Sequence, residues 1–278
     1  MSKLLQTTLL FCFILIILSA CSDNPTPTVT ITKPVTLTPV PQNVTAAITS
    51  TNLVSASLTP ASSETETINL LKAAFQNQEK QAYRFKVTQK EIINPGMLVT
   101  AEGEGSYATN NLKLNLELTV GSQHQQVETL VIAGESWQRL VSLAVWRKLE
   151  DGFKSAATLP VSLIDKAQEV KTEGKEQVNG KELTRLSFSL PVSLAFSEKG
   201  GFGADALGIL SVTGTDKSLA GFTGNATMTV WIDTANATIQ QRQLNIKAGD
   251  LDYEALYAYR DFGAVGIDAS PPANFPRP

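Results

Sequence analysis

Four leucines alternate with polar residues over residues 112–118 without a break, and this is the strictest pattern in the chain. Successive side chains of a β-strand point to opposite faces of a sheet, so leucine at every second position predicts one dry and one solvated face. Residues 83–88 alternate in the same way. Strands of this kind build an antiparallel sheet whose core lies on one side.

Further segments have strand composition, bounded by turn residues. They are residues 126–133, 136–140, 145–149, 182–190, 226–233, 239–248 and 251–262. Asn94-Pro95-Gly96 and Asn179-Gly180 are typical of tight turns between strands. We therefore expect long antiparallel strands and no repeated strand-helix-strand units.

One amphipathic helix is predicted at the start of the domain. Ser63 and Glu66 have the spacing of a capping box, in which each satisfies a free backbone donor. The apolar residues that follow share one helical face over about four turns; they are Ile68, Leu71, Ala74 and Phe75. A second helix is expected at residues 162–170, and a short mobile helical insert at the glycine-rich residues 198–214.

The N-terminus has the layout of a bacterial lipoprotein signal. Lys3 supplies a positive charge, and the apolar run of residues 9–18 is shorter than the roughly 20 residues that span a bilayer. Leu18-Ser19-Ala20-Cys21 follows, and the Cys21 thiol is a nucleophile that can accept a diacylglycerol. We expect a lipid anchor on Cys21 at the extracytoplasmic face of the cell membrane. The alternative is an ordinary signal peptide with a chance cysteine.

Composition divides the chain into three regions. Residues 1–20 are the predicted signal peptide, residues 21–62 a disordered tether rich in Pro, Thr and Ser, and residues 63–278 one folded domain. An extended tether of about 3.1 Å per residue could hold the domain up to roughly 100 Å from the membrane. Besides lipidated Cys21, the exported chain would keep no thiol, so the fold must depend on its apolar core.

The residues of common catalytic and metal sites are missing from the sequence. His124 is the single histidine, which excludes a multi-histidine zinc site and makes a role in catalysis improbable. Glu102 and Glu104 fall on the solvated face of a strand. Residues 201–206 fit a dinucleotide-binding pattern without the strand-helix-strand setting that it requires. Because these residues are missing, we expect no enzyme activity, cofactor or metal, and the net charge of −3 indicates that there is no nucleic-acid partner.

Three short motifs in the second half of the chain carry a resemblance to a known family. They are Val178-Asn179-Gly180-Lys181-Glu182-Leu183, Val230-Trp231-Ile232-Asp233, and Tyr257-Ala258-Tyr259-Arg260-Asp261-Phe262-Gly263 with Ile267 and Pro271-Pro272. In this order, behind a lipobox and a tether, they resemble the LppX/LprA/LprF/LprG family of bacterial lipoproteins, related in fold to LolA and LolB. The resemblance covers residues 64–272, and none of the motifs is catalytic.

The resemblance implies an α+β fold in which a curved antiparallel sheet, or half-barrel, encloses two or three helices and an apolar cavity for acyl chains. The strand pattern leads to a similar expectation, because a dry concave face offers more apolar surface than short helices cover. Inward-facing residues would form both core and cavity wall. They are Phe85, Val99, Leu112, Leu114, Leu116, Leu118, Leu186, Phe188, Met228, Val230, Ile232, Leu244 and Ile246.

The expected function is binding of lipids or acylated glycolipids, with or without their transfer, by a membrane-anchored protein. Its partners would be the membrane, through the lipid anchor, and the lipid ligand. The alternative is a scaffold or envelope sensor whose half-barrel is filled by its own side chains. Lipid that co-purifies with the protein distinguishes the two.

Overall fold

The computed structural model describes residues 64–93, 97–109, 111–132, 134–143, 145–149, 161–195, 223–249, 251–264, 266–273 and 275. All of them belong to the second of two units, Ser57–Pro278. The predicted signal peptide, the tether, the turn at residues 94–96 and the glycine-rich residues 198–214 lie outside the described residues.

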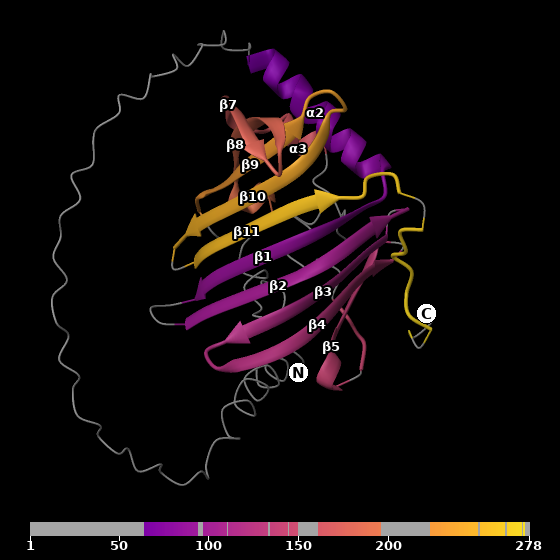
Figure 1. Ribbon diagram of the computed structural model, residues 1–278. Helices are drawn as coiled ribbons and strands as arrows, with labels where there is room; N and C mark the ends of the chain where they lie inside the picture. Colours follow the sequence, from indigo (N-terminus) through magenta and orange to yellow (C-terminus); the bar gives the residue numbers. More distant parts are fainter. Residues whose placement is uncertain are drawn as a thin grey trace, which may run out of the picture. The chain divides into compact units, whose positions relative to one another are not determined.

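The strands in this part of the chain form one open antiparallel sheet (Figure 1). In chain order they are β1 (Tyr83–Ile93), β2 (Met97–Ala108), β3 (Asn111–Val120), β4 (Gln123–Ile132), β5 (Glu135–Leu140), β6 (Arg147–Lys148), β7 (Gln168–Val178), β8 (Lys181–Pro191), β9 (Asn225–Asp233), β10 (Thr238–Ala248) and β11 (Leu251–Arg260). Their order across the sheet is β6-β5-β4-β3-β2-β1-β11-β10-β9-β8-β7, so the first strand pairs with the last at its centre.

The predicted strands are confirmed, although the segment at residues 145–149 shortens to the two residues of β6. The predicted tight turn at Asn179-Gly180 is also confirmed. It joins β7 and β8, and both residues have positive φ angles, of 51° and 79°. Backbone in this region matches the twist of a two-residue hairpin.

The predicted helix at residues 162–170 is wrong. The helix α3 (Val161–Ile164) ends after one turn, and β7 begins at Gln168. Glu169 has a φ of 52°, at a bulge that shifts the pairing between Gln168 and Lys171. Pairing with β8 therefore overrides the helical composition of this segment. Its bulges and exposed charges are features that keep an edge strand from pairing with another chain.

The helix α2 (Glu64–Lys80) confirms the first predicted helix and packs against β7 and β10. Its buried residues include Leu71, Ala74 and Phe75, and the Phe75 ring meets the edge of Phe188 on β8, with centroids 6.4 Å apart. Asn77 Nδ2 donates hydrogen bonds to two carbonyl oxygens of the β9–β10 turn, at 3.1 and 3.2 Å. The other described helices, α4 (Val192–Ala195) and the 3-10 helix η1 (Val141–Leu143), are short.

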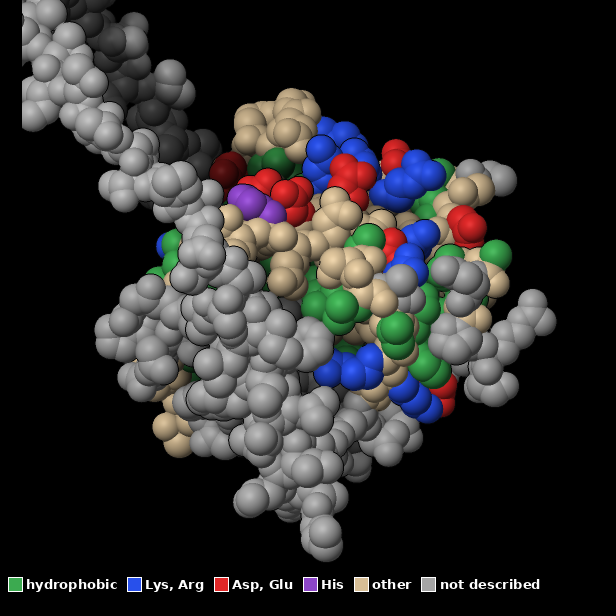
Figure 2. Space-filling model, turned by 90° about the horizontal axis from the view of Figure 1, so that it is seen from below, with side chains coloured by type: hydrophobic (Ala, Val, Ile, Leu, Met, Phe, Trp, Pro, Cys, Tyr) green, Lys and Arg blue, Asp and Glu red, His purple; other side chains and the backbone are tan. Residues whose placement is uncertain are grey.

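Two glycines of β2 lie where any side chain would clash with neighbouring atoms. A Cβ atom at Gly103 would lie 1.9 Å from the carbonyl oxygen of Asn115, and one at Gly105 would lie 2.1 Å from the Phe85 ring. Only glycine fits at either position, so the Phe85 ring rests on bare backbone. The lower end of the sheet in Figure 1, which includes the β3–β4 turn, carries mixed hydrophobic and charged side chains (Figure 2).

Candidate functional site

The inner face of the sheet, defined as the face against which α2 packs, holds the whole predicted core and cavity wall. The thirteen predicted residues come from β1, β2, β3, β8, β9 and β10, and each has an exposed fraction of 3% or less. They belong to one hydrophobic cluster. They are Phe85, Val99, Leu112, Leu114, Leu116, Leu118, Leu186, Phe188, Met228, Val230, Ile232, Leu244 and Ile246. The alternation pattern thus assigned all of them to the correct face.

The strand β11 lies between the two groups of strands that carry these residues, since it pairs with β1 on one side and with β10 on the other. Tyr257 lies between Val87 on β1 and Arg242 on β10, and Ala255 is opposite Leu244. Inward residues of β11 and of β4, among them Tyr253 and Val127, are buried in the same cluster. They were not selected from the sequence, although the predicted strand at residues 251–262 has the alternation that could have found them.

The leucine row of β3 runs from the interior toward one end of the sheet. The exposed fraction is 0% at Leu112 and Leu114 and 3% at Leu116 and Leu118, and it rises to 38% at Val120. Among the residues that the structure describes, the one long helix packs against β7 and β10, on the other half of the sheet. The row therefore forms an apolar track that leads from the core to the sheet end.

Polar side chains interrupt the inner face at the centre of the sheet, and sequence analysis missed them. Glu91 has no exposed surface, and Gln89 and Arg242 are 3% exposed. Gln89 Nε2 donates to the Tyr257 hydroxyl at 3.2 Å, and the Arg242 guanidinium lies 4.3 Å from the centre of the Tyr257 ring. Their positions in the sequence could have revealed them, because Gln89 and Glu91 lie an even number of residues after Phe85 and therefore share its face of the strand.

Tyr83 belongs to an aromatic cluster at the start of β1. Its ring stacks on Tyr107, with centroids 5.0 Å apart, and meets Tyr259 edge-on at 5.4 Å. Burial, and then the neighbouring Tyr259 and Tyr107, raise the pKa of Tyr83 well above its ordinary value of 10.0, while Arg242 opposes the shift. The folded protein therefore keeps this phenol neutral at pH values where an unfolded chain would lose the proton.

Tyr83→Phe should make the protein less sensitive to alkaline pH. Because the folded pKa is raised, the stabilisation is complete below pH 10.0 and is lost as the pH rises through the folded pKa. Urea unfolding at a series of pH values measures this loss. We expect the free energy of unfolding to fall less steeply above about pH 10 in the variant than in the wild type. Equal slopes would contradict the assignment.

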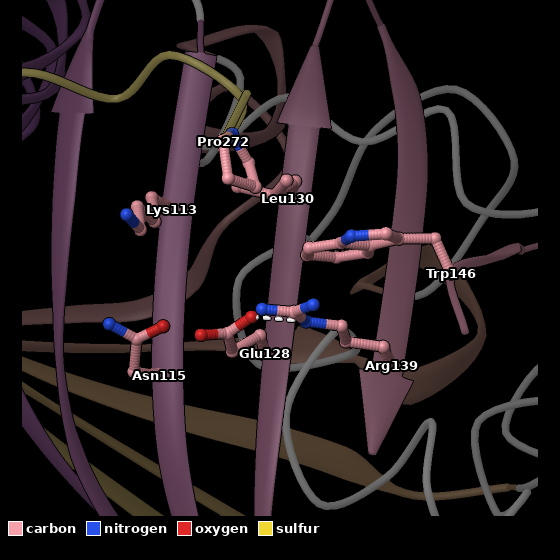
Figure 3. A pocket seen from close by; sticks show the side chains of 7 residues that line it. All are labelled: Lys113, Asn115, Glu128, Leu130, Arg139, Trp146 and Pro272. Atoms are coloured by element: carbon pink, nitrogen blue, oxygen red, sulfur yellow. Dashed lines mark hydrogen bonds and ion pairs between the residues drawn. The ribbon is translucent and has the colours of Figure 1, made fainter. Parts of the chain in front are cut away.

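The opposite, outer face holds a small hollow of about 30 Å³, open to solvent (Figure 3). It is lined by Lys113, Asn115, Glu128, Leu130, Arg139, Trp146 and Pro272. Arg139 Nε contacts Glu128 at 2.5 Å, and its guanidinium lies 4.7 Å from the centre of the Trp146 ring. Trp137 and Trp146 both pack against Phe275. The hollow thus lies where the C-terminal segment packs onto β3 to β5.

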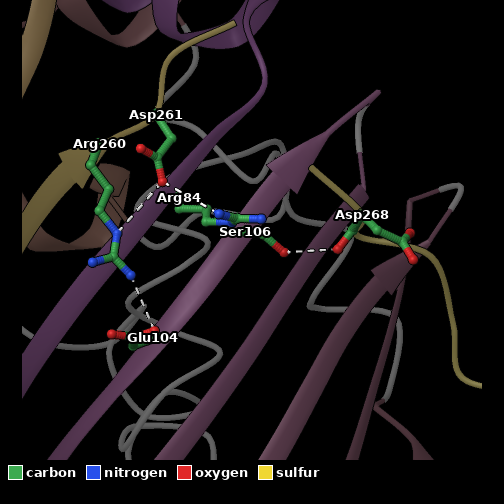
Figure 4. A network of polar contacts seen from close by, with 6 residues as sticks. All are labelled: Arg84, Glu104, Ser106, Arg260, Asp261 and Asp268. Carbon is green, nitrogen blue, oxygen red and sulfur yellow. Dashed lines mark hydrogen bonds and ion pairs between the residues drawn. The ribbon is translucent and has the colours of Figure 1, made fainter. Parts of the chain in front are cut away.

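An ion-pair network on β1, β2 and β11 lies beside the same C-terminal segment (Figure 4). Arg260 contacts Glu104 at 3.2 Å and Asp261 at 3.8 Å, and Arg84 contacts Asp261 at 3.5 Å. Ser106 Oγ donates to the Asp268 carbonyl oxygen at 3.2 Å. Glu104 is exposed, as predicted for the solvated face. The Ser106 hydrogen bond links the C-terminal segment to β2.

His124 is exposed at the start of β4, with Nδ1 3.0 Å from Thr119 Oγ1 and 3.8 Å from Glu117 Oε1. Over the described ranges, no three His, Cys, Asp or Glu side chains are grouped so that they could hold a metal ion. Within the same ranges, no helix has the length and hydrophobicity needed to cross a membrane.

No family model and no curated protein matches the sequence. Solved structures align with the chain at low identity. Lipoprotein LppX of Mycobacterium tuberculosis aligns with a TM-score of 0.46 and 12% identity over 74% of this chain and 100% of its own. LprF from Mycobacterium bovis gives 0.45 and 11% over 73% and 96%. A LolA superfamily protein from Nitrosomonas europaea gives 0.24 and 10% over 70% and 91%.

The chain has the predicted α+β fold, an open antiparallel sheet with helices and an apolar inner face. The LppX and LprF lipoproteins and the LolA superfamily, which the sequence motifs resemble, are all represented among the similar structures.

Proposed function

We propose that this protein is a cell-envelope lipoprotein, anchored through Cys21 at the extracytoplasmic face of the membrane, whose half-barrel binds the acyl chains of lipids or acylated glycolipids. The observation that supports binding is the apolar track of β3, which continues from buried Leu112 to exposed Val120.

The energetics of lipid extraction favour a buried wall over a surface patch. Removing one long acyl chain from a bilayer costs on the order of 10 kcal/mol, at about 0.8 kcal/mol per CH₂. A carrier must therefore supply an equally dry environment along the length of the chain. Leu114, Leu116 and Leu118 give the track the apolar chemistry for this role.

Binding is tested by lipid uptake. The full chain, purified from membranes, is stripped of lipid and mixed with vesicles that contain a lipid with a fluorescent acyl chain. Saturable uptake, and delivery to a second vesicle population, would support binding and transfer respectively. If the chain took up no lipid and yielded none on solvent extraction, the scaffold or sensor function would be the better account.

Cys21→Ala should abolish acylation. The residues Leu18-Ser19-Ala20-Cys21 behind a short apolar run motivate this expectation, since only the Cys21 thiol at that border can form the thioether. Metabolic labelling with a fatty acid should mark the wild type and the control Cys12→Ala equally. Label that persisted in Cys21→Ala would disprove the anchor.

A further inference from the structure

The turn that follows β5 is unusually apolar for an exposed segment. Val141 and Leu143, in η1, have exposed fractions of 38% and 52%, and Val145 reaches 70%. Exposed turns ordinarily carry Gly, Asn, Asp, Ser or Pro, which solvate well and suit the backbone. Exposed aliphatic side chains are unfavourable in water, and their transfer to an apolar environment is favourable.

Two more exposed aliphatic residues lie toward the same end of the sheet. β5 runs toward the β3–β4 turn, since Leu140 is opposite Val127, which is opposite Leu116. Val120 precedes that turn on the inner face and is paired with Val99, and Leu98, the residue before Val99, is 47% exposed on the outer face. We call this set the apolar rim; its members are Leu98, Val120, Val141, Leu143 and Val145.

Cations accompany the rim. Arg147 is exposed two residues beyond Val145, and exposed Lys90 precedes Ile92, the residue opposite Leu98. In the view from below, hydrophobic side chains lie among both basic and acidic side chains (Figure 2). Aliphatic side chains flanked by basic ones are typical of surfaces that enter the headgroup region of an anionic bilayer.

We propose that the apolar rim docks on the surface of the bilayer in which the Cys21 lipid is inserted. This inference rests on the anchoring in the proposed function. The occupant follows from the chain that precedes the described domain, because residues 22–63 lead back to a lipid anchor and keep the domain close to one membrane. Tethering makes docking intramolecular, so that a few shallow aliphatic contacts suffice.

Docking through the apolar rim would also place the Val120 end of the leucine track of β3 at the bilayer. Val120 is both a member of the rim and the last inward residue of the track that begins at Leu112. An acyl chain that leaves the bilayer at Val120 would remain on apolar surface as it moved toward Leu114. The rim would thus be the place where lipid enters.

The test is a fluorophore on the rim. Cys12 lies in the predicted signal peptide and Cys21 would be lipidated, so Leu143→Cys provides a single reactive thiol for the environment-sensitive dye NBD in the processed full chain. The matched control is Lys181→Cys, at an exposed position at the start of β8, near the opposite edge of the sheet. Both proteins are reconstituted in vesicles of phosphatidylcholine and phosphatidylglycerol.

We expect NBD at position 143 to shift to shorter wavelength, to brighten several-fold, and to be quenched by spin-labelled lipid, with none of these changes at position 181. Unchanged emission at position 143 in chains that float with the vesicles would overturn the rim proposal and leave the anchor intact. A shift without quenching by the lipid would mean that another protein surface covers the rim, which also overturns it. Chains that did not float would refute the anchor on which the proposal depends.

Discussion

Leu116→Arg should yield a folded protein that has lost its bound lipid. Leu116 is 3% exposed on the inner face, and its neighbours across the strands are Gly103 and Val127. In a lipid-binding track the guanidinium can extend past Leu118 toward the exposed end at Val120 and reach water. We therefore expect a destabilisation of about 1–3 kcal/mol, together with loss of lipid, because a charge replaces apolar wall.

The matched control is Asn115→Arg, which places the same side chain on the exposed outer face of the same strand. It should keep both the melting temperature and the bound lipid of the wild type. If Leu116 belonged to a closed core, its arginine would be buried without access to water, and the variant would unfold or fail to accumulate. A stable Leu116→Arg protein with full lipid occupancy would exclude the track as the binding surface.

Phe75→Ala should cost about 3–5 kcal/mol of the free energy of unfolding, as is usual for a phenylalanine removed from a core. Phe75 has no exposed surface, and its ring packs edge-on against Phe188 of β8. It has the largest of the apolar side chains that α2 buries. Urea unfolding followed by circular dichroism measures the loss.

Gln76→Ala is the control for that experiment, because Gln76 is the exposed neighbour of Phe75 on the same helix. Its free energy of unfolding should stay within about 0.5 kcal/mol of the wild-type value. Were Phe75→Ala as stable as Gln76→Ala, α2 would contribute little to the core, and the packing described above would be wrong.

The parts of the fold that could be predicted are those in which one face of an element is buried. The burial of Leu112 to Leu118 and of Phe75 could be predicted, because a buried face has apolar residues at the period of its strand or helix. β7 could not be predicted in this way, since Gln168–Val178 is largely exposed and has no such period. Its extended form comes from pairing with β8, which is a tertiary contact.

In the candidate site, too, only the residues of a regular apolar face could be predicted. The apolar wall followed from alternation, and all thirteen residues lie on one face. Glu91 and Arg242 could not be placed by composition, because charged residues in alternating strands normally mark the solvated side. The apolar rim was missed as well. Val145 fell in a predicted strand and Leu143 in no predicted element, and the exposure of either residue is visible only in the folded chain.

Native mass spectrometry of the intact protein, purified from its membranes in a detergent that is removed in the gas phase, tests the central claim most directly. For the wild type and Asn115→Arg, we expect discrete peaks above the acylated chain, and the mass difference of each peak from that chain should equal the mass of a bound lipid. For Leu116→Arg we expect the acylated chain alone. A wild-type spectrum that contained only the acylated chain, before and after incubation with lipid vesicles, would contradict lipid binding.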